Sequence, residues 1–181
     1  MAANVLRFAL FGKEFQAGKT VSIHRLIDSL KARGAEIYIE RTFFRYITSA
    51  LGMEVEVSGV FDNYNFDVDF VISIGGDGTF LRAASMVGSK ATPIIGVNTG
   101  RLGFLADIHP DEIDHAIAEI VDGHYAVEPH AVIMVEADGE IIEGSPFALN
   151  DIAVLKRDNA AMISVRTCIN GEYLVTYQAD G

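Results

Sequence analysis

The chain has 181 residues, half of them apolar, and a formal net charge of −11 at pH 7. A chain of this length can bury a full hydrophobic core, and its acidic balance argues against the Lys- and Arg-rich surface of a nucleic-acid-binding protein. The charge mainly favours solubility; a nucleotide would need local N–H groups, basic residues or Mg²⁺ to offset the overall field.

The sequence carries no sign of a membrane partner. No apolar run reaches the roughly 18 residues of a membrane span, and residues 1–4 lack the order of a signal peptide. Cys168 is the single cysteine, so an internal disulfide is excluded. A reducing compartment suits this composition, and we expect a cytoplasmic protein.

The first part of the chain alternates between strand and helix patterns. We expect strands at residues 5–11, 36–40, 68–74 and 92–97, and helices at residues 20–32, 42–51, 79–87 and 110–121. Such alternation predicts an α/β fold with a doubly wound, mostly parallel sheet covered on both faces. Ligands of such sheets bind at the carboxyl ends of the strands.

The residues Gly75 to Thr79 read Gly-Gly-Asp-Gly-Thr and follow the apolar run of the third expected strand. A strand that stops at glycines and turns into a helix presents backbone N–H groups to a phosphate. Asp77 would repel that phosphate, unless it faces a hydroxyl that must lose a proton or a cation that accompanies the phosphates. The alternative is that Asp77 is a turn residue or the N-cap of the helix.

A second glycine-punctuated loop, residues 98–107, follows the last strand of this half. Asn98 and Asp77 both fall at carboxyl ends of strands, so we expect them at one edge of the sheet. Asn98 and Arg101 are candidate binding residues of this loop. Phe104 is expected to pack inward.

From residue 123 onward the pattern changes to strands and turns. We expect strands at residues 125–137, 140–143, 147–156, 162–170 and 172–179. Asp138-Gly139 and Asn170-Gly171 are hairpin dipeptides, which predicts antiparallel pairing. The sequence therefore predicts an α/β domain of residues 1–122 and a β-rich domain of residues 123–181 that is cut short, since the chain stops on a turn dipeptide.

Several other sites are disfavoured by spacing. Five residues separate Gly12 from Gly18, where a Walker loop has four, and Lys13 occupies a glycine position of that motif. Leu81 occupies the third glycine position of the dinucleotide fingerprint. The five histidines show no metal-ligand spacing, and no Gly-x-Ser-x-Gly motif is present. We predict no metal-ligating residues.

Asn150 and Asp151 place two polar residues inside an expected apolar strand. A buried polar group without a partner costs about 1–3 kcal/mol. A ligand hydroxyl or amide would supply such a partner; backbone groups at a strand crossing are the alternative.

Four motifs together resemble the NAD kinase family: GGDGTFLRAA, NTGRLGFLAD, ALNDIAVLKRD and the terminal YQADG. Members phosphorylate the adenosine ribose 2′-hydroxyl of NAD to give NADP. Diacylglycerol kinases, sphingosine kinases and phosphofructokinases share loops like the first motif, but the four in this order are specific to NAD kinases. The resemblance implies an N-terminal α/β domain followed by a β-rich domain.

The resemblance also implies roles for the first loop and its helix. Asp77 is the proton acceptor that activates the 2′-hydroxyl. Gly78 and Arg82 match positions that contact the dinucleotide, and Thr79 assists at the phosphates. The implied donor is ATP, or polyphosphate in some members, with a divalent metal such as Mg²⁺, and the implied assembly is a homodimer or homotetramer.

In the second half, Asn150 and Asp151 match the family's NAD-binding pair, and Asp180 matches an acidic residue that contacts NAD from a strand end. Gln178 stands where many members have a basic residue. The family continues beyond the last Asp-Gly with a substrate loop and most of the β domain, so the resemblance implies an incomplete fragment. A lipid kinase that shares the loop, or a nucleotide-binding module without turnover, are the alternative functions.

Overall fold

The computed structural model describes residues 5–13, 20–62, 65–100, 103–138, 146–156 and 162–181. The chain forms two compact units, Met1–Leu149 and Asn150–Gly181. The domain boundary expected near Asp122 remains a prediction. No helix among the described residues is both long and apolar enough to pass through a lipid bilayer.

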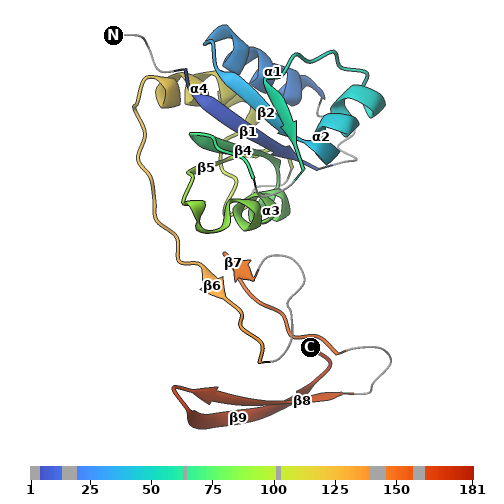
Figure 1. Cartoon of the computed structure of the whole chain (residues 1–181), viewed down its shortest axis with the longest axis vertical. Helices are drawn as coiled ribbons and strands as arrows, with labels where there is room; N and C mark the ends of the chain where they lie inside the picture. Colours follow the sequence, from blue (N-terminus) through green and yellow to red (C-terminus); the bar gives the residue numbers. More distant parts are fainter. Residues whose placement is uncertain (1–4, 14–19, 63–64, 101–102, 139–145, 157–161) are drawn as a thin grey trace. The chain divides into compact units, whose positions relative to one another are not determined.

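A five-stranded parallel sheet forms the centre of the first unit (Figure 1). Its strand order is β3-β2-β1-β4-β5, which confirms the predicted doubly wound α/β fold. The sequence did not predict β3, because three residues are too few to show a strand period. The strands are β1 (Arg7–Gly12), β2 (Glu36–Glu40), β3 (Gly59–Phe61), β4 (Phe70–Gly75) and β5 (Ile94–Asn98).

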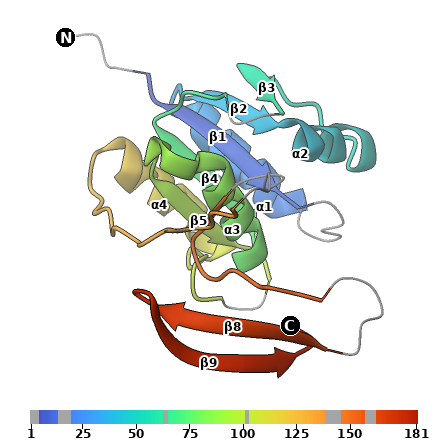
Figure 2. The same ribbon diagram turned by 60° about the horizontal axis from the view of Figure 1, so that its bottom comes forward.

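Helices cover both faces of this sheet (Figure 2). The expected helix of residues 42–51 is in fact a short α-helix that continues as a π-helical turn. The expected helix of residues 110–121 opens with a 3₁₀ turn. The helices are α1 (Thr20–Ala32), α2 (Arg41–Arg45), η1 (Tyr46–Ala50), α3 (Asp77–Val87), η2 (Gly88–Lys90), η3 (Pro110–Glu112) and α4 (Ile113–Val121).

The alternation of side chains along β1 divides the core into two layers. Phe8 and Leu10 pack in the cluster that includes α1 and α4, whereas Ala9 and Phe11 pack in the cluster that includes α3. Successive strand residues point to opposite faces, so a strand buried on both faces is apolar throughout. The two layers hold the carboxyl ends of the strands at one edge, where the glycine loop lies.

The antiparallel pairing predicted for the second half is confirmed in two strand pairs. β6 (Ile133–Met134) pairs with β7 (Phe147–Ala148) in the first unit, and β8 (Ile163–Ile169) pairs with β9 (Glu172–Ala179) in the second. Asn170 and Gly171 join β8 to β9 with φ of 52° and 86°, as a two-residue hairpin turn with positive φ requires.

Two predicted strands of this half are much shorter than expected. Residues 125–137 contain only β6, and residues 147–156 contain only β7. An apolar pattern makes a strand only where a neighbour supplies hydrogen bonds, and the ladder between β6 and β7 involves two residues on each strand. The expected strand at residues 140–143 and the Asp138-Gly139 turn fall on residues outside the described part, in whole or in part.

Candidate functional site

The glycine loop joins β4 to α3 at the carboxyl edge of the sheet. β4 ends at Gly75, Gly76 is the N-cap, and α3 begins at Asp77, two residues before the expected start at Thr79. The carbonyl of Gly76 accepts hydrogen bonds from the N–H groups of Thr79 at 2.9 Å and Phe80 at 3.2 Å. The helix therefore starts directly after the strand, and its positive N-terminal end lies at the strand end.

The second loop lies beside the first, as the sequence predicted. Gly75 and Asn98 are register partners at the ends of β4 and β5. The N–H of Thr99 donates to the carbonyl of Gly75 at 2.9 Å, and the side chain of Asn98 accepts from the N–H of Gly100 at 2.8 Å. These bonds bring both loops to one edge of the sheet.

The carboxylate of Asp77 is bound by the backbone of the second loop. Its Oδ2 accepts from the N–H of Phe104 at 2.9 Å, and its Oδ1 accepts from the N–H groups of Leu105 at 3.1 Å and Ala106 at 3.2 Å. The alternative role for Asp77, as a helix N-cap or a local turn residue, is therefore wrong, since Gly76 is the N-cap and the carboxylate bonds another segment.

These hydrogen bonds also lower the pKa of Asp77. The N–H of Phe104, followed by that of Leu105, holds the pKa of the carboxyl below its ordinary value, the N–H of Ala106 acts in the same direction, and partial desolvation opposes them. Hydrogen bonds to the charged form favour that form. Asp77 is an anion at neutral pH, and these bonds stabilise that form.

The segment that supplies these amides is itself fixed to β5. The N–H of Ile108 donates to the carbonyl of Gly96 at 3.0 Å, and the N–H of Asn98 donates to the carbonyl of Ile108 at 2.8 Å. A Cβ on Gly96 would lie 2.6 Å from the Cα of Ala106, so the segment approaches as closely as a glycine permits. The amides around Asp77 thus have a rigid support.

The glycines of the two loops differ in what they accommodate. A Cβ on Gly76 or Gly78 would meet nothing within 4 Å, and neither glycine has the positive φ that favours glycine. A Cβ on Gly103 would lie 2.6 Å from Cγ and 2.8 Å from Oδ2 of Asp77. A side chain at position 103 would therefore conflict with the observed place of the Asp77 carboxylate, whereas one at position 76 or 78 would meet no atom of the described residues.

Arg82 lies on α3, as expected, and pairs with a residue that the sequence analysis did not single out. Its guanidinium lies 3.0 Å from Oε1 of Glu40, whose side chain is 6% exposed. Oε2 of Glu40 accepts the N–H of Phe43 at 2.9 Å and caps α2. Glu40 is the last residue of β2. An acidic residue at the carboxyl end of an expected strand is the sequence signal that could have pointed to it.

Phe104, Thr79 and Arg101 are the remaining loop residues that the sequence analysis named. Phe104 does not pack inward: its side chain is fully exposed, and its backbone N–H donates to Asp77. Thr79, in the first turn of α3, is buried. Arg101 lies outside the described residues.

The remaining predicted site residues belong to the second unit. Asn150 and Asp151 are exposed and outside any strand, so their expected place inside a buried strand is wrong; they bond each other at 3.1 Å. β7 ends at Ala148, before this pair. Asp180 follows β9 directly, and its carbonyl accepts the N–H of Lys156 at 3.3 Å. The binding roles of these three residues stay predictions.

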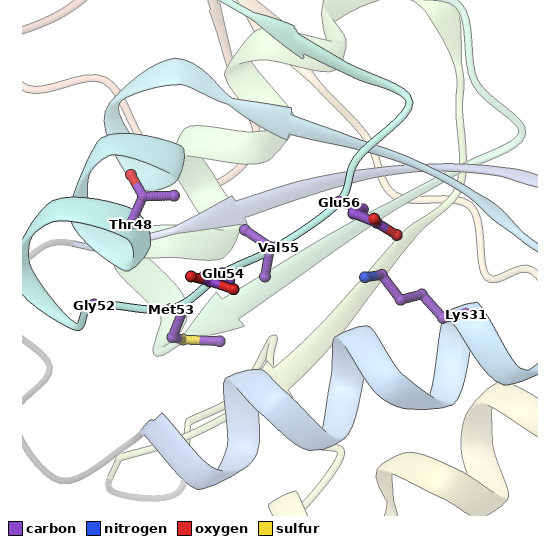
Figure 3. Close-up of a pocket in the computed structure, with 7 residues that line it drawn as sticks. All are labelled: Lys31, Thr48, Gly52, Met53, Glu54, Val55 and Glu56. Carbon is purple, nitrogen blue, oxygen red and sulfur yellow. The ribbon is translucent and has the colours of Figure 1, made fainter.

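An open groove of about 710 Å³ lies elsewhere in the first unit (Figure 3). The side chains of Lys31 and Glu56 point toward one another across it. No residue of the glycine loop or of the segment 103–106 lines it. Its lining consists of Lys31, Thr48, Gly52, Met53, Glu54, Val55 and Glu56.

The fold and the loop define a doubly wound α/β protein with a phosphate-binding type of strand-to-helix turn and an ionised carboxylate within it. Residues 19–125 match the family model described as ATP-NAD kinase N-terminal domain. The chain belongs to the NAD kinase family.

Relatives of this chain carry the same family name. It is 51% identical over 176 residues to an NAD kinase of Bacteroides fragilis, covering 97% of this chain and 61% of the relative. It is 40% identical over 176 residues to an NAD kinase of Porphyromonas gingivalis, covering 97% of this chain and 60% of the relative. The chain thus spans about three fifths of the length of these relatives.

Solved structures of similar fold include two kinases. A crystal structure of an NAD kinase from Archaeoglobus fulgidus in complex with ATP is 26% identical, with a TM-score of 0.62, and the match covers 97% of this chain and 58% of that one. A crystal structure of yeast NADH kinase complexed with NADH has a TM-score of 0.72 at 20% identity, covering 97% of this chain and 56% of that one. The second likeness concerns the fold alone.

Proposed function

We propose that this chain carries the phosphoryl-transfer part of an NAD kinase, which moves the γ-phosphoryl group of Mg·ATP to the adenosine ribose 2′-hydroxyl of NAD. The observation that supports the proposal is the environment of Asp77 at the start of α3. Its carboxylate is ionised and accepts hydrogen bonds from the backbone N–H groups of residues 104–106. A loop that served only to bind phosphate would gain nothing from this charge.

The hydrogen bonds of Asp77 support Oδ2 as the atom that accepts the proton. A carboxylate has about four acceptor sites, two on each oxygen. Among the described residues, Oδ1 accepts two amides and Oδ2 accepts one, which leaves one acceptor site of Oδ2 for a hydroxyl donor. The 2′-oxygen bonds to the γ-phosphorus, the bond from that phosphorus to the bridging oxygen of ADP breaks, and the hydroxyl proton passes to Oδ2 and then to solvent.

A carboxylate with a lowered pKa suits this step, although it is a weak base. Phosphoryl transfer passes through a loose transition state in which the nucleophile needs orientation more than early deprotonation. An acceptor that stays ionised and fixed orients the hydroxyl at every pH near neutrality. The main role of Asp77 is therefore to orient the 2′-hydroxyl, and its role as proton acceptor is secondary.

The glycines and Arg82 would serve the phosphates. Gly76 and Gly78 have free space where a Cβ would be, so their lack of side chains leaves the backbone open to an approaching ligand. The guanidinium of Arg82 is about half exposed and uses one nitrogen for Glu40, which leaves N–H donors for a phosphate. We infer that Thr79, in the first turn of α3, assists at the phosphates.

We infer the substrates from similar proteins. The archaeal structure that resembles this chain contains ATP, and the yeast structure contains NADH. Mg²⁺ enters as part of the donor, where it neutralises phosphate charge. We also infer that Asn150, Asp151 and Asp180 contact NAD, that the protein is cytoplasmic, and that it assembles as a homodimer or homotetramer, which sedimentation analysis would test.

The experiment is NADP formation from NAD and Mg·ATP, measured with this chain and with a longer chain that has the length of the relatives. Asp77→Asn should abolish turnover and retain NAD binding by calorimetry, whereas Asp28→Asn, an exposed acid on α1, should change neither. Phosphorylation of a diacylglycerol or of sphingosine in place of NAD would overturn the proposal, as would nucleotide binding by both chains without turnover.

A further inference from the structure

We propose that Gly103 is a positioning residue for Asp77. Because Gly103 has no side chain, the Asp77 carboxylate can accept hydrogen bonds from the amides of residues 104–106 in one orientation. This inference rests on the proposed function for its catalytic meaning, but its structural content stands without that function. Gly103 belongs to none of the site residues that the motifs of the sequence assign a role.

The closeness of the contact carries the inference. A Cβ at position 103 would lie 2.6 Å from Cγ and 2.8 Å from Oδ2 of Asp77, and closer still to Oδ1. Carbon atoms of real side chains do not approach a carboxylate so closely, so any other residue would displace Asp77 or the segment. The φ of Gly103 is not in the positive region, so space, not backbone conformation, makes glycine necessary here.

Hydrogen bonds at Thr99 and Ile108 oppose a movement of the segment away from Asp77. Thr99 bonds the carbonyl of Gly75, and Ile108 bonds Gly96 and Asn98 on β5. Ala106 lies against Gly96, where another Cβ would already be too close. A side chain at position 103 would therefore act on the carboxylate, which is the movable partner.

The consequence for the reaction is one of geometry. A displaced carboxylate loses its bonds to the amides of residues 104–106, and its open acceptor site on Oδ2 no longer has a fixed direction. Misplacement of a reacting group by about 1 Å costs on the order of 100-fold in rate. Gly103→Ala should lower kcat by that factor and leave the KM for ATP within about twofold.

The first test does not depend on activity. Amide hydrogen exchange of residues 104–106 is measured by NMR at neutral pH in the wild-type chain, Gly103→Ala and Asp77→Ala. Both variants should expose the same three amides to faster exchange, and Phe104→Leu, which keeps the backbone donors, should not. Unchanged exchange in Asp77→Ala would overturn the inference.

A double-mutant cycle covers the case in which Gly103→Ala is poorly folded. If the added Cβ conflicts with the carboxylate, the loss of unfolding free energy caused by Gly103→Ala should be smaller in the Asp77→Ala background than in the wild type. Equal losses in the two backgrounds would overturn the inference.

The kinetic test uses the longer chain and separates the two proposals. If the wild type is inactive, the proposed function fails and the exchange experiment still decides the role of Gly103. If the wild type is active and Gly103→Ala retains its kcat, the positioning role is overturned and the proposed function stands.

Discussion

Glu40 and Arg82 form an ion pair of 3.0 Å that joins the end of β2 to the helix after the glycine loop. The other oxygen of the same carboxylate caps α2 through the N–H of Phe43. One buried acid thus orients two elements at the edge of the sheet where the site lies.

The two tasks of Glu40 are separable by substitution. Glu40→Gln keeps an oxygen for the N–H of Phe43 and removes the charge beside Arg82, whereas Glu40→Ala removes both. We expect Glu40→Ala to lose about 1–2 kcal/mol of unfolding free energy through the cap, and Glu40→Gln to lose less. Urea unfolding of both variants measures the difference, and equal losses would contradict a separate capping contribution.

Gly78 should be needed for the ligand and not for the fold. Gly78→Ala places a methyl group in open space within the first turn of α3, so stability should stay level or rise by about 0.5–1 kcal/mol. Calorimetry with Mg·ATP should show affinity reduced about tenfold or more, which is about 1.4 kcal/mol. Unchanged affinity would mean that no ligand approaches this backbone.

Gly34→Ala is the opposite case and serves as its control. Gly34 has φ of +68° beyond the end of α1, with no atom within 4 Å of a Cβ. Alanine is strained in this conformation, so we expect a loss of about 1 kcal/mol in unfolding free energy. Affinity for Mg·ATP should be that of the wild type.

Asp69 should make stability depend on pH in the acidic range. Its hydrogen bonds with the Arg7 side chain are the main cause that holds its pKa below the ordinary 3.8, and burial partly opposes them. A depressed pKa in the folded state gives a contribution that is present above pH 3.8 and is lost as pH falls through the lower folded value.

Asp69→Asn should therefore be less stable than the wild type near neutrality, with a difference that shrinks as the pH falls below 3.8. Urea unfolding at several pH values measures this. Asp67→Asn is the matched control, because its carboxylate pairs with the same Arg7 but is 92% exposed, and it should have little effect. A constant difference for Asp69→Asn across the range would contradict the assignment.

Ser73 lies on β4 with its hydroxyl buried, and its Oγ has no hydrogen-bond partner among the described residues. Such a group costs its desolvation, so Ser73→Ala should leave the unfolding free energy level or raise it by about 1 kcal/mol. Ser29→Ala is the control: Ser29 is also buried, but its Oγ accepts from Arg33 at 2.8 Å, and its loss should cost about 1 kcal/mol. Thermal unfolding of the two variants should move in opposite directions.

Strand and helix patterns predicted most of the α/β half, because all its elements but the shortest are long enough to show their period. The helix Thr20–Ala32 and the strand Glu36–Glu40 have the predicted bounds. β3 was missed, and the strand expected at residues 147–156 reduces to Phe147–Ala148. Strands depend on partners that are distant in the chain, and local pattern does not contain those partners.

The sequence by itself determined the class of fold, the order of strand, glycine loop and helix, and Asp77 as the carboxylate in that loop. Only the tertiary structure decided what Asp77 contacts, why residue 103 is glycine, and that Glu40 holds Arg82. The physical reason is that periodicity and turn chemistry act over neighbouring residues. The amide of Phe104 reaches Asp77 across 27 positions, because two strands of one sheet end side by side.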